Sequence, residues 1–158
     1  MPDEIRNVFI SHIHEDDDGL LNLKTLLQNN GLQIRDGSIT SDNPNDATNE
    51  DYIKSQILAP RIRWAGVLIV YVSPRTKEST YVDWEIEYAH KIGKRIVGVW
   101  AWGAKNTDLP KALDEYADAV VGWNSGRIID AISGQINDWT GPDGELRPER
   151  AIRRYACR

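Results

Sequence analysis

Six consecutive hydrophobic residues, Val67 to Val72, constrain the fold of this chain more than any other segment. A strand with one face in water alternates hydrophobic and polar side chains, whereas a strand covered on both faces need not alternate. The run is also far shorter than the roughly 20 residues that a membrane-spanning helix needs. We therefore expect it to be the central strand of a parallel sheet with helices on both faces.

Other strand-like runs alternate with segments of helical periodicity along the rest of the chain. The expected strands are residues 7–11, 32–35, 67–72, 95–102 and 119–121, and the expected helices are about 16–30, 52–58, 79–92, 109–116 and 125–139. Gly31 is a natural stop for the first helix. Five strands alternating with five helices predict an α/β, flavodoxin-like, doubly wound parallel sheet of strand order 2-1-3-4-5.

The length of 158 residues favours one domain, which we place at residues 1–139. Residues 36–49 are rich in Asp, Asn, Ser and Thr and predict a long loop, which in a compact domain is often functional. Residues 140–158 form an arginine-rich tail after the break at 141–144. We expect the tail to be either a solvated terminal helix or an arm that docks on a partner.

Composition excludes several classes of function. The formal net charge of −5 and pI near 5.2 argue against nucleic acid as a partner, because neutralising phosphates requires clustered Lys and Arg. The single cysteine, Cys157, cannot form an internal disulfide, a dithiol redox motif or a cysteine-rich zinc site. The first residues lack a basic and then apolar leader. We expect a cytoplasmic protein with no membrane segment.

The predicted fold indicates where to look for a site. Ligands of open parallel sheets bind beyond the carboxyl ends of the strands, where the strand order reverses, which here is between the first and third strands. The segments that reach this point are residues 11–16, 36–40, 73–76 and 79–85.

Helix geometry separates two carboxylates in the last of these segments. Glu85 and Glu87 lie two positions apart, so their side chains differ in direction by about 200°. Glu87 falls on the polar side of the helix, whereas Glu85 falls in line with Tyr81 and Tyr88 on a face that turns toward the sheet. A carboxylate half-buried there costs free energy unless it has a partner, which favours a functional acid.

Two other interpretations of the acidic segment after the first strand are weaker. His12, His14 and Glu15 invite a metal hypothesis, but carboxylates at a helix start equally well complement the helix dipole, and we expect no metal. A response-regulator receiver requires an aspartate after the third strand, where this chain has Ser73. A flavodoxin requires an uncharged phosphate loop after the first strand, which this acidic segment is not.

The chain resembles a TIR-like domain, in particular the stand-alone bacterial kind that serves as the signal-producing subunit of the Thoeris anti-phage system. The matching segments are residues 8–12, 36–40, 67–73, 79–86 and 93–99, in the correct order. The most specific segment is 79–86. In the family the catalytic glutamate stands four residues after an aromatic residue, usually Trp, and here the match is Tyr81 followed by Glu85.

The resemblance implies an enzyme that cleaves NAD⁺ at the nicotinamide–ribose bond, with NAD⁺ as substrate and no cofactor. Glu85 would be catalytic. The residues expected to line the substrate site are Phe9, Ser11, His12, Asp36, Ser38, Ser73, Tyr81 and Trp84. The product would be a cyclic ADP-ribose-type signal that a separate effector senses, and a phage-derived trigger with self-association would activate the enzyme.

Two alternatives remain open at this stage. The first is a catalytically silent TIR-like module that works by self-association through the long loop at 36–49. The second is a nucleotide-modifying or nucleotide-hydrolysing domain of flavodoxin-like topology. A Glu85 in an aromatic-lined cleft favours the enzyme, whereas an exposed Glu85 together with an apolar loop tip favours the silent module.

Overall fold

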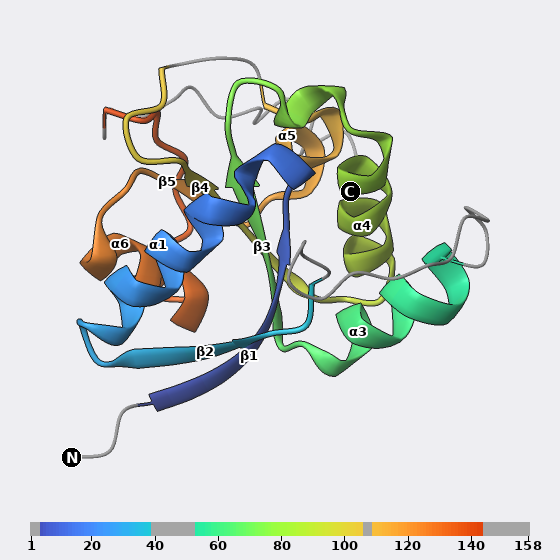
Figure 1. Cartoon of the computed structure of the whole chain (residues 1–158), viewed down its shortest axis with the longest axis horizontal. Helices are drawn as coiled ribbons and strands as arrows, with labels where there is room; N and C mark the ends of the chain where they lie inside the picture. The colour runs from blue at the N-terminus through green and yellow to red at the C-terminus, as the bar shows by residue number, and fades with distance from the viewer. Residues whose placement is uncertain (1–3, 39–52, 106–108, 144–158) are drawn as a thin grey trace.

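The computed structural model describes residues 4–38, 53–105 and 109–143. The sheet has the order β2-β1-β3-β4-β5 and all its strand pairs are parallel, which confirms the predicted topology (Figure 1). The strands are β1 (Glu4–Ser11), β2 (Leu32–Asp36), β3 (Val67–Val72), β4 (Arg95–Trp100) and β5 (Ala119–Val121).

Helices cover both faces of the sheet (Figure 1). In chain order the helical segments are η1 (His14–Asp16), α1 (Asp17–Gln28), η2 (Ile53–Leu58), α3 (Ala59–Trp64), η3 (Thr76–Glu78), α4 (Thr80–Lys91), α5 (Lys111–Tyr116) and α6 (Ser125–Ser133). Side chains of α1 and α6 pack on one face, and side chains of α3, α4 and α5 pack on the other.

The central strand β3 explains why its sequence does not alternate. All six of its residues are buried. Leu68, Val70 and Val72 belong to the core under α3, α4 and α5, whereas Val67, Ile69 and Tyr71 belong to the core under α1 and α6. Full burial of each aliphatic side chain contributes about 1.5–3 kcal/mol to stability. Because β3 places side chains in both cores, it joins them into one folding unit.

A glycine in a left-handed conformation follows the end of two helices. Gly31 has a φ of 91°, a left-handed conformation that glycine adopts without strain, and it follows the end of α1 as predicted. The prediction that the last helix runs to residue 139 is wrong, because α6 ends at Ser133 and Gly134 has a φ of 90°. Instead, Trp139 forms a bridge beside β5, and the Trp100 indole donates a hydrogen bond to the Thr140 carbonyl.

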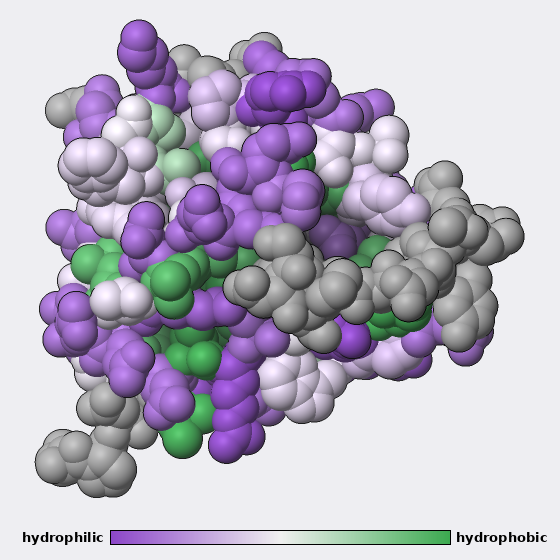
Figure 2. Space-filling view, in the orientation of Figure 1, coloured by the Kyte–Doolittle hydropathy of each residue, from purple (hydrophilic) through white to green (hydrophobic). Residues whose placement is uncertain are grey.

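Some expectations lie outside the described residues. Asp36 is the last residue of β2 rather than the first of a loop, and residues 39–49 of the expected loop are not described. The arginine-rich segment from 144 onward is also not described. Among the described residues, no helix combines the length and hydrophobicity needed to cross a membrane. The face drawn in Figure 2 is largely hydrophilic, with a band of hydrophobic side chains over α1 and β2.

Candidate active site

A buried contact between α4 and the end of β1 forms the centre of the site. Helix α4 begins after Ser79, whose side chain accepts a hydrogen bond from the Val82 amide and caps the helix. One turn further on, Glu85 is only 6% exposed, and its Oε1 accepts a hydrogen bond of 2.7 Å from Ser11 Oγ. Ser11 is the last residue of β1 and is itself buried. The predicted inward direction of Glu85 is confirmed, and Glu87 is exposed as expected.

Burial controls the protonation of this glutamate. Three effects together raise the pKa of Glu85 from 4.5 to about 8, and the largest is desolvation, since the charged form loses its hydration. The Ser11 hydrogen bond acts in the opposite direction and lowers the pKa, while the charge of Asp36 raises it further. At neutral pH most molecules therefore hold Glu85 as a neutral carboxylic acid. A pKa raised this far is more common at functional sites than elsewhere.

Asp36 supplies the second carboxylate of the site. Its Oδ1 accepts hydrogen bonds from the amides of Ile10 and Ser38, and its Oδ2 accepts one from Ser38 Oγ at 2.7 Å. The Lys24 ammonium lies 3.3 Å from Oδ2. Four partners for one buried carboxylate satisfy its lone pairs and fix the end of β2 against β1. The predicted residues Ser11, Asp36, Ser38 and Glu85 are thus gathered at the carboxyl ends of β1 and β2.

Ser73 belongs to a neighbouring polar cluster rather than to the Ser11–Glu85 contact. Its Oγ donates to Asp16 Oδ2 at 2.6 Å, and its amide donates to Thr76 Oγ1 at 2.8 Å. Burial raises the pKa of Asp16, and the bond from Ser73 partly offsets that effect. The cluster ties the loop after β3 to the start of α1. Burial raises the pKa of the nearby Tyr71, and the charge of Asp16 adds to this effect.

The close approach of α1 to Tyr71 gives a stability prediction. A Cβ added at Gly19 would lie 2.2 Å from the Tyr71 hydroxyl oxygen and 2.6 Å from Cζ. The Tyr71 ring is buried and packs edge-on against Trp123, so it cannot simply swing away. We expect Gly19→Ala to lower the free energy of unfolding by about 1–3 kcal/mol, measured by urea denaturation. The exposed Leu21→Ala in the same helix is the control, and equal stability of Gly19→Ala and wild type would contradict the prediction.

His12 has a structural role in this arrangement. Its Nδ1 lies 2.8 Å from the Ile10 carbonyl oxygen and its Nε2 lies 2.8 Å from Asp17 Oδ1. Both ring nitrogens are therefore engaged, and the ring ties the end of β1 to the start of α1. His14 is exposed and contacts the other oxygen of Asp17 at 3.2 Å. Within the described ranges, no group of three or more potential ligands is arranged to hold a metal ion.

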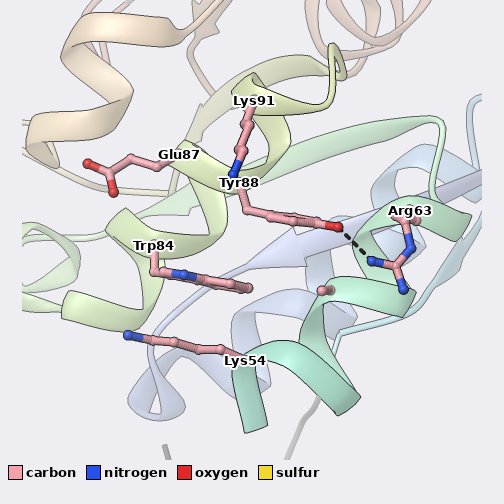
Figure 3. Close-up of a pocket in the computed structure, with 7 residues that line it drawn as sticks. Lys54, Arg63, Trp84, Glu87, Tyr88 and Lys91 are labelled. Carbon is pink, nitrogen blue, oxygen red and sulfur yellow. Dashed lines mark hydrogen bonds between the residues drawn. The ribbon is translucent and has the colours of Figure 1, made fainter. Parts of the chain in front are cut away.

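The three aromatic residues expected at the substrate site lie in three different environments, and their contact with substrate stays a prediction. Phe9 is 0% exposed and lies in the core under α3, α4 and α5, on the same face of β1 as Ser11, which is two residues further along the strand. Tyr81 is half-buried, with the Lys54 ammonium 5.6 Å from its ring centre. Trp84 turns toward α3 and lines a groove with Tyr88 and Lys54 (Figure 3). One residue along a helix is a rotation of about 100°, which separates Trp84 from Glu85.

Sequence reasoning missed two contributors to these polar clusters. Lys24 reaches Asp36 only because α1 packs beside β2. No sequence pattern near residue 24 indicates this ion pair. Thr76 is fully buried and receives the Ser73 amide within a tight turn. A Ser–Pro–x–Thr turn directly after the central strand was a usable local signal for this contact, since Ser and Thr side chains commonly hydrogen-bond nearby backbone.

The fold and the site together define a doubly wound α/β domain with a buried acid at its topological switch point. The family described as "Thoeris protein ThsB, TIR-like domain" matches residues 9–106. The chain belongs to this family. The matched region contains every residue of the Ser11, Asp36, Ser38 and Glu85 site.

Similar solved structures include two proteins of low sequence identity. The CMP N-glycosidase BcmB of Clostridium botulinum is 14% identical, with a TM-score of 0.44, over 96% of this chain and 98% of that one. The TIR domain of the Toll-related receptor TRR-2 from Hydra magnipapillata is 18% identical, with a TM-score of 0.47, over 80% of this chain and 91% of that one. No curated protein matches the sequence significantly.

Proposed function

We propose that this protein cleaves the bond between nicotinamide and ribose in NAD⁺, with Glu85 as the catalytic carboxylate. The observation that carries the proposal is the nearly buried Glu85, hydrogen-bonded to Ser11 at the carboxyl end of β1. Membership of the Thoeris TIR-like family supports NAD⁺ as the substrate. The position of Glu85, four residues after Tyr81, agrees with the family pattern.

The reaction requires little more from the protein than one negative charge beside the ribose. The C1′–N bond breaks with its electron pair moving to the pyridinium nitrogen, so nicotinamide leaves as a neutral molecule and needs no general acid. Ordinary glycosides need a second carboxylic acid because their leaving group is poor. The ionised Glu85 stabilises the oxocarbenium ion that develops on the ribose. Water then adds to C1′ and releases a proton to give ADP-ribose, or an internal nucleophile adds to give a cyclic isomer.

The raised pKa of Glu85 fits a resting enzyme. With a pKa of about 8 the group is mostly neutral at pH 7 and lacks the charge that the reaction needs. A bound pyridinium ribose places a positive charge beside the carboxyl, which favours its ionised form. Substrate binding therefore ionises and activates the Glu85 carboxyl group. Any change that exposes Glu85 to water has the same effect.

In this proposal the product serves anti-phage defence. A cyclic ADP-ribose-type product acts as the signal for a separate effector protein, and a phage-derived trigger with self-association of the enzyme controls its formation. This role comes from the family rather than from the geometry of the site.

The test is to incubate the protein and its Glu85→Gln variant with NAD⁺ and to separate the products by mass. We expect nicotinamide together with ADP-ribose or its cyclic isomer from the wild type. Glu85→Gln should be slower by at least about 100-fold, the scale on which one transition-state group acts. Glu87→Gln is the control and should keep full activity. Failure of the wild type to turn over NAD⁺, even with lysate of phage-infected cells as a trigger, would favour the silent signalling module.

A further inference from the structure

A hollow lies between α4 and the η2–α3 segment, on the side of α4 that carries Trp84 and Tyr88 (Figure 3). Its volume is about 640 Å³, within the usual range for small-molecule sites. We call it the α3–α4 groove. It is lined by Lys54, Ala59, Arg63, Trp84, Glu87, Tyr88 and Lys91.

The groove is built around a stack of side chains. The rings of Trp84 and Tyr88 are 5.3 Å apart and inclined by 8°, and the Lys54 ammonium lies 5.7 Å from the centre of the Trp84 ring. In Figure 3, Lys54, Trp84 and Tyr88 form successive layers, and Lys91 lies beyond Tyr88 on the side away from Trp84. Both faces of Trp84 are thus covered, by Tyr88 and by Lys54. An additional ring can extend the stack only on the outer face of Tyr88.

Positive charge surrounds that outer face. Arg63 Nη1 donates a hydrogen bond of 2.6 Å to the Tyr88 hydroxyl, which uses one of the five N–H donors of the guanidinium. Lys94 Nζ donates to the Arg63 carbonyl and fixes the end of α3. The groove holds three cationic residues against one carboxylate, Glu87, in a protein whose formal net charge is −5. Cations gathered in one groove of an acidic protein favour an anion locally.

We propose that the α3–α4 groove is a second, non-catalytic binding site for a nucleotide. The base stacks on the outer face of Tyr88 and the phosphate lies between Arg63 and Lys91. Glu87 at the rim accepts hydrogen bonds from ribose hydroxyls or an exocyclic amine. A bare phosphate would leave the aromatic wall unused, and a neutral nucleoside would leave the two cations unused. The inference does not depend on NAD⁺ cleavage, because no groove residue lies in the Ser11–Glu85 contact.

The experiment is a calorimetric titration of the full chain with AMP at low ionic strength. We expect a Kd below about 1 mM, and binding weaker by at least about tenfold for adenosine and for ribose 5-phosphate. The double variant Arg63→Gln/Lys91→Gln should weaken AMP binding by at least about tenfold, since charge-assisted phosphate contacts are lost. The matched control is Lys77→Gln/Lys111→Gln, which neutralises two exposed lysines elsewhere and should leave the Kd unchanged.

Nuclear magnetic resonance locates the bound AMP independently of affinity. The Trp84 indole and Tyr88 ring signals should shift on titration in the wild type and in Glu85→Gln, whereas the Ser11 amide should not. Three results would overturn the proposal. They are the absence of saturable AMP binding, an unchanged Kd in the double variant, and equal affinity for inorganic phosphate or an oligoglutamate peptide, which would make the groove a general anion or acidic-peptide site.

Discussion

Glu85→Gln is expected to raise the free energy of unfolding by about 3 kcal/mol at pH 7 and by about 5 kcal/mol above pH 8, where the carboxylate is ionised in both states. The wild-type protein holds an acid in a site that disfavours its charge. Glutamine has nearly the same shape and carries no charge to desolvate. Its amide can still contact Ser11 Oγ, so the packing between α4 and β1 is retained.

The sign of the pH dependence follows from proton binding. The folded pKa of Glu85 is about 8 and the ordinary value is 4.5, so between these pH values the folded state binds more protons than the unfolded state. Wild-type stability therefore falls as pH rises through this window, relative to Glu85→Gln. Below pH 4.5 the glutamate is protonated in both states and the difference between the two proteins should nearly vanish. Above pH 8 the difference should level off.

Urea denaturation of both proteins from pH 4 to pH 9 checks this expectation. The difference between them removes the contribution of all other titrating groups. Glu87→Gln, on the exposed side of the same helix, should track the wild type within about 0.5 kcal/mol, as surface substitutions usually do. A stability difference that does not change with pH would mean that Glu85 is ionised in the folded protein at neutral pH.

The sequence carries enough information for the topology and for the direction of Glu85, since both depend on local periodicity. The unbroken run Val67–Val72 identifies the buried central strand. The helical rotation of about 200° places Glu85 inward and Glu87 outward. The early end of α6 was missed although Gly134 is a local stop signal of the same kind as Gly31, because the periodicity of the hydrophobic residues continues past the glycine to Trp139, which instead lies beside β5.

The hydrogen-bond partners within the polar clusters could not be predicted from the sequence, because they depend on tertiary packing. His12 was expected to face a ligand, but Asp17 and the Ile10 carbonyl occupy both of its nitrogens. Trp84 is expected to line the substrate site, and in the structure its ring lies in the groove between α3 and α4. Polarity and position along the chain indicate that a side chain lies near the switch point. They do not indicate which hydrogen bond it makes there.

Opposite shifts in the pH dependence of activity are expected from two substitutions that flank Glu85. If the ionised carboxylate is the active form, kcat/KM for NAD⁺ should rise with pH to a midpoint near 8 in the wild type. Ser11→Ala removes the hydrogen bond that lowers the pKa of Glu85, so the midpoint should move up by about one unit. Asp36→Asn removes the neighbouring negative charge that raises this pKa, so the midpoint should move down.

The direction of each shift separates an electrostatic role from a merely structural one. General loosening of the fold would lower activity at every pH, whereas a change in the field at Glu85 moves the midpoint. Ser73→Ala is the matched control, because Ser73 bonds to Asp16 and is not among the groups that act on Glu85. Reduced activity of Ser11→Ala with an unchanged midpoint would instead assign Ser11 to direct contact with the substrate. Shifts of the same sign in both variants would rule out Glu85 as the titrating group, because its two neighbours act on it in opposite directions.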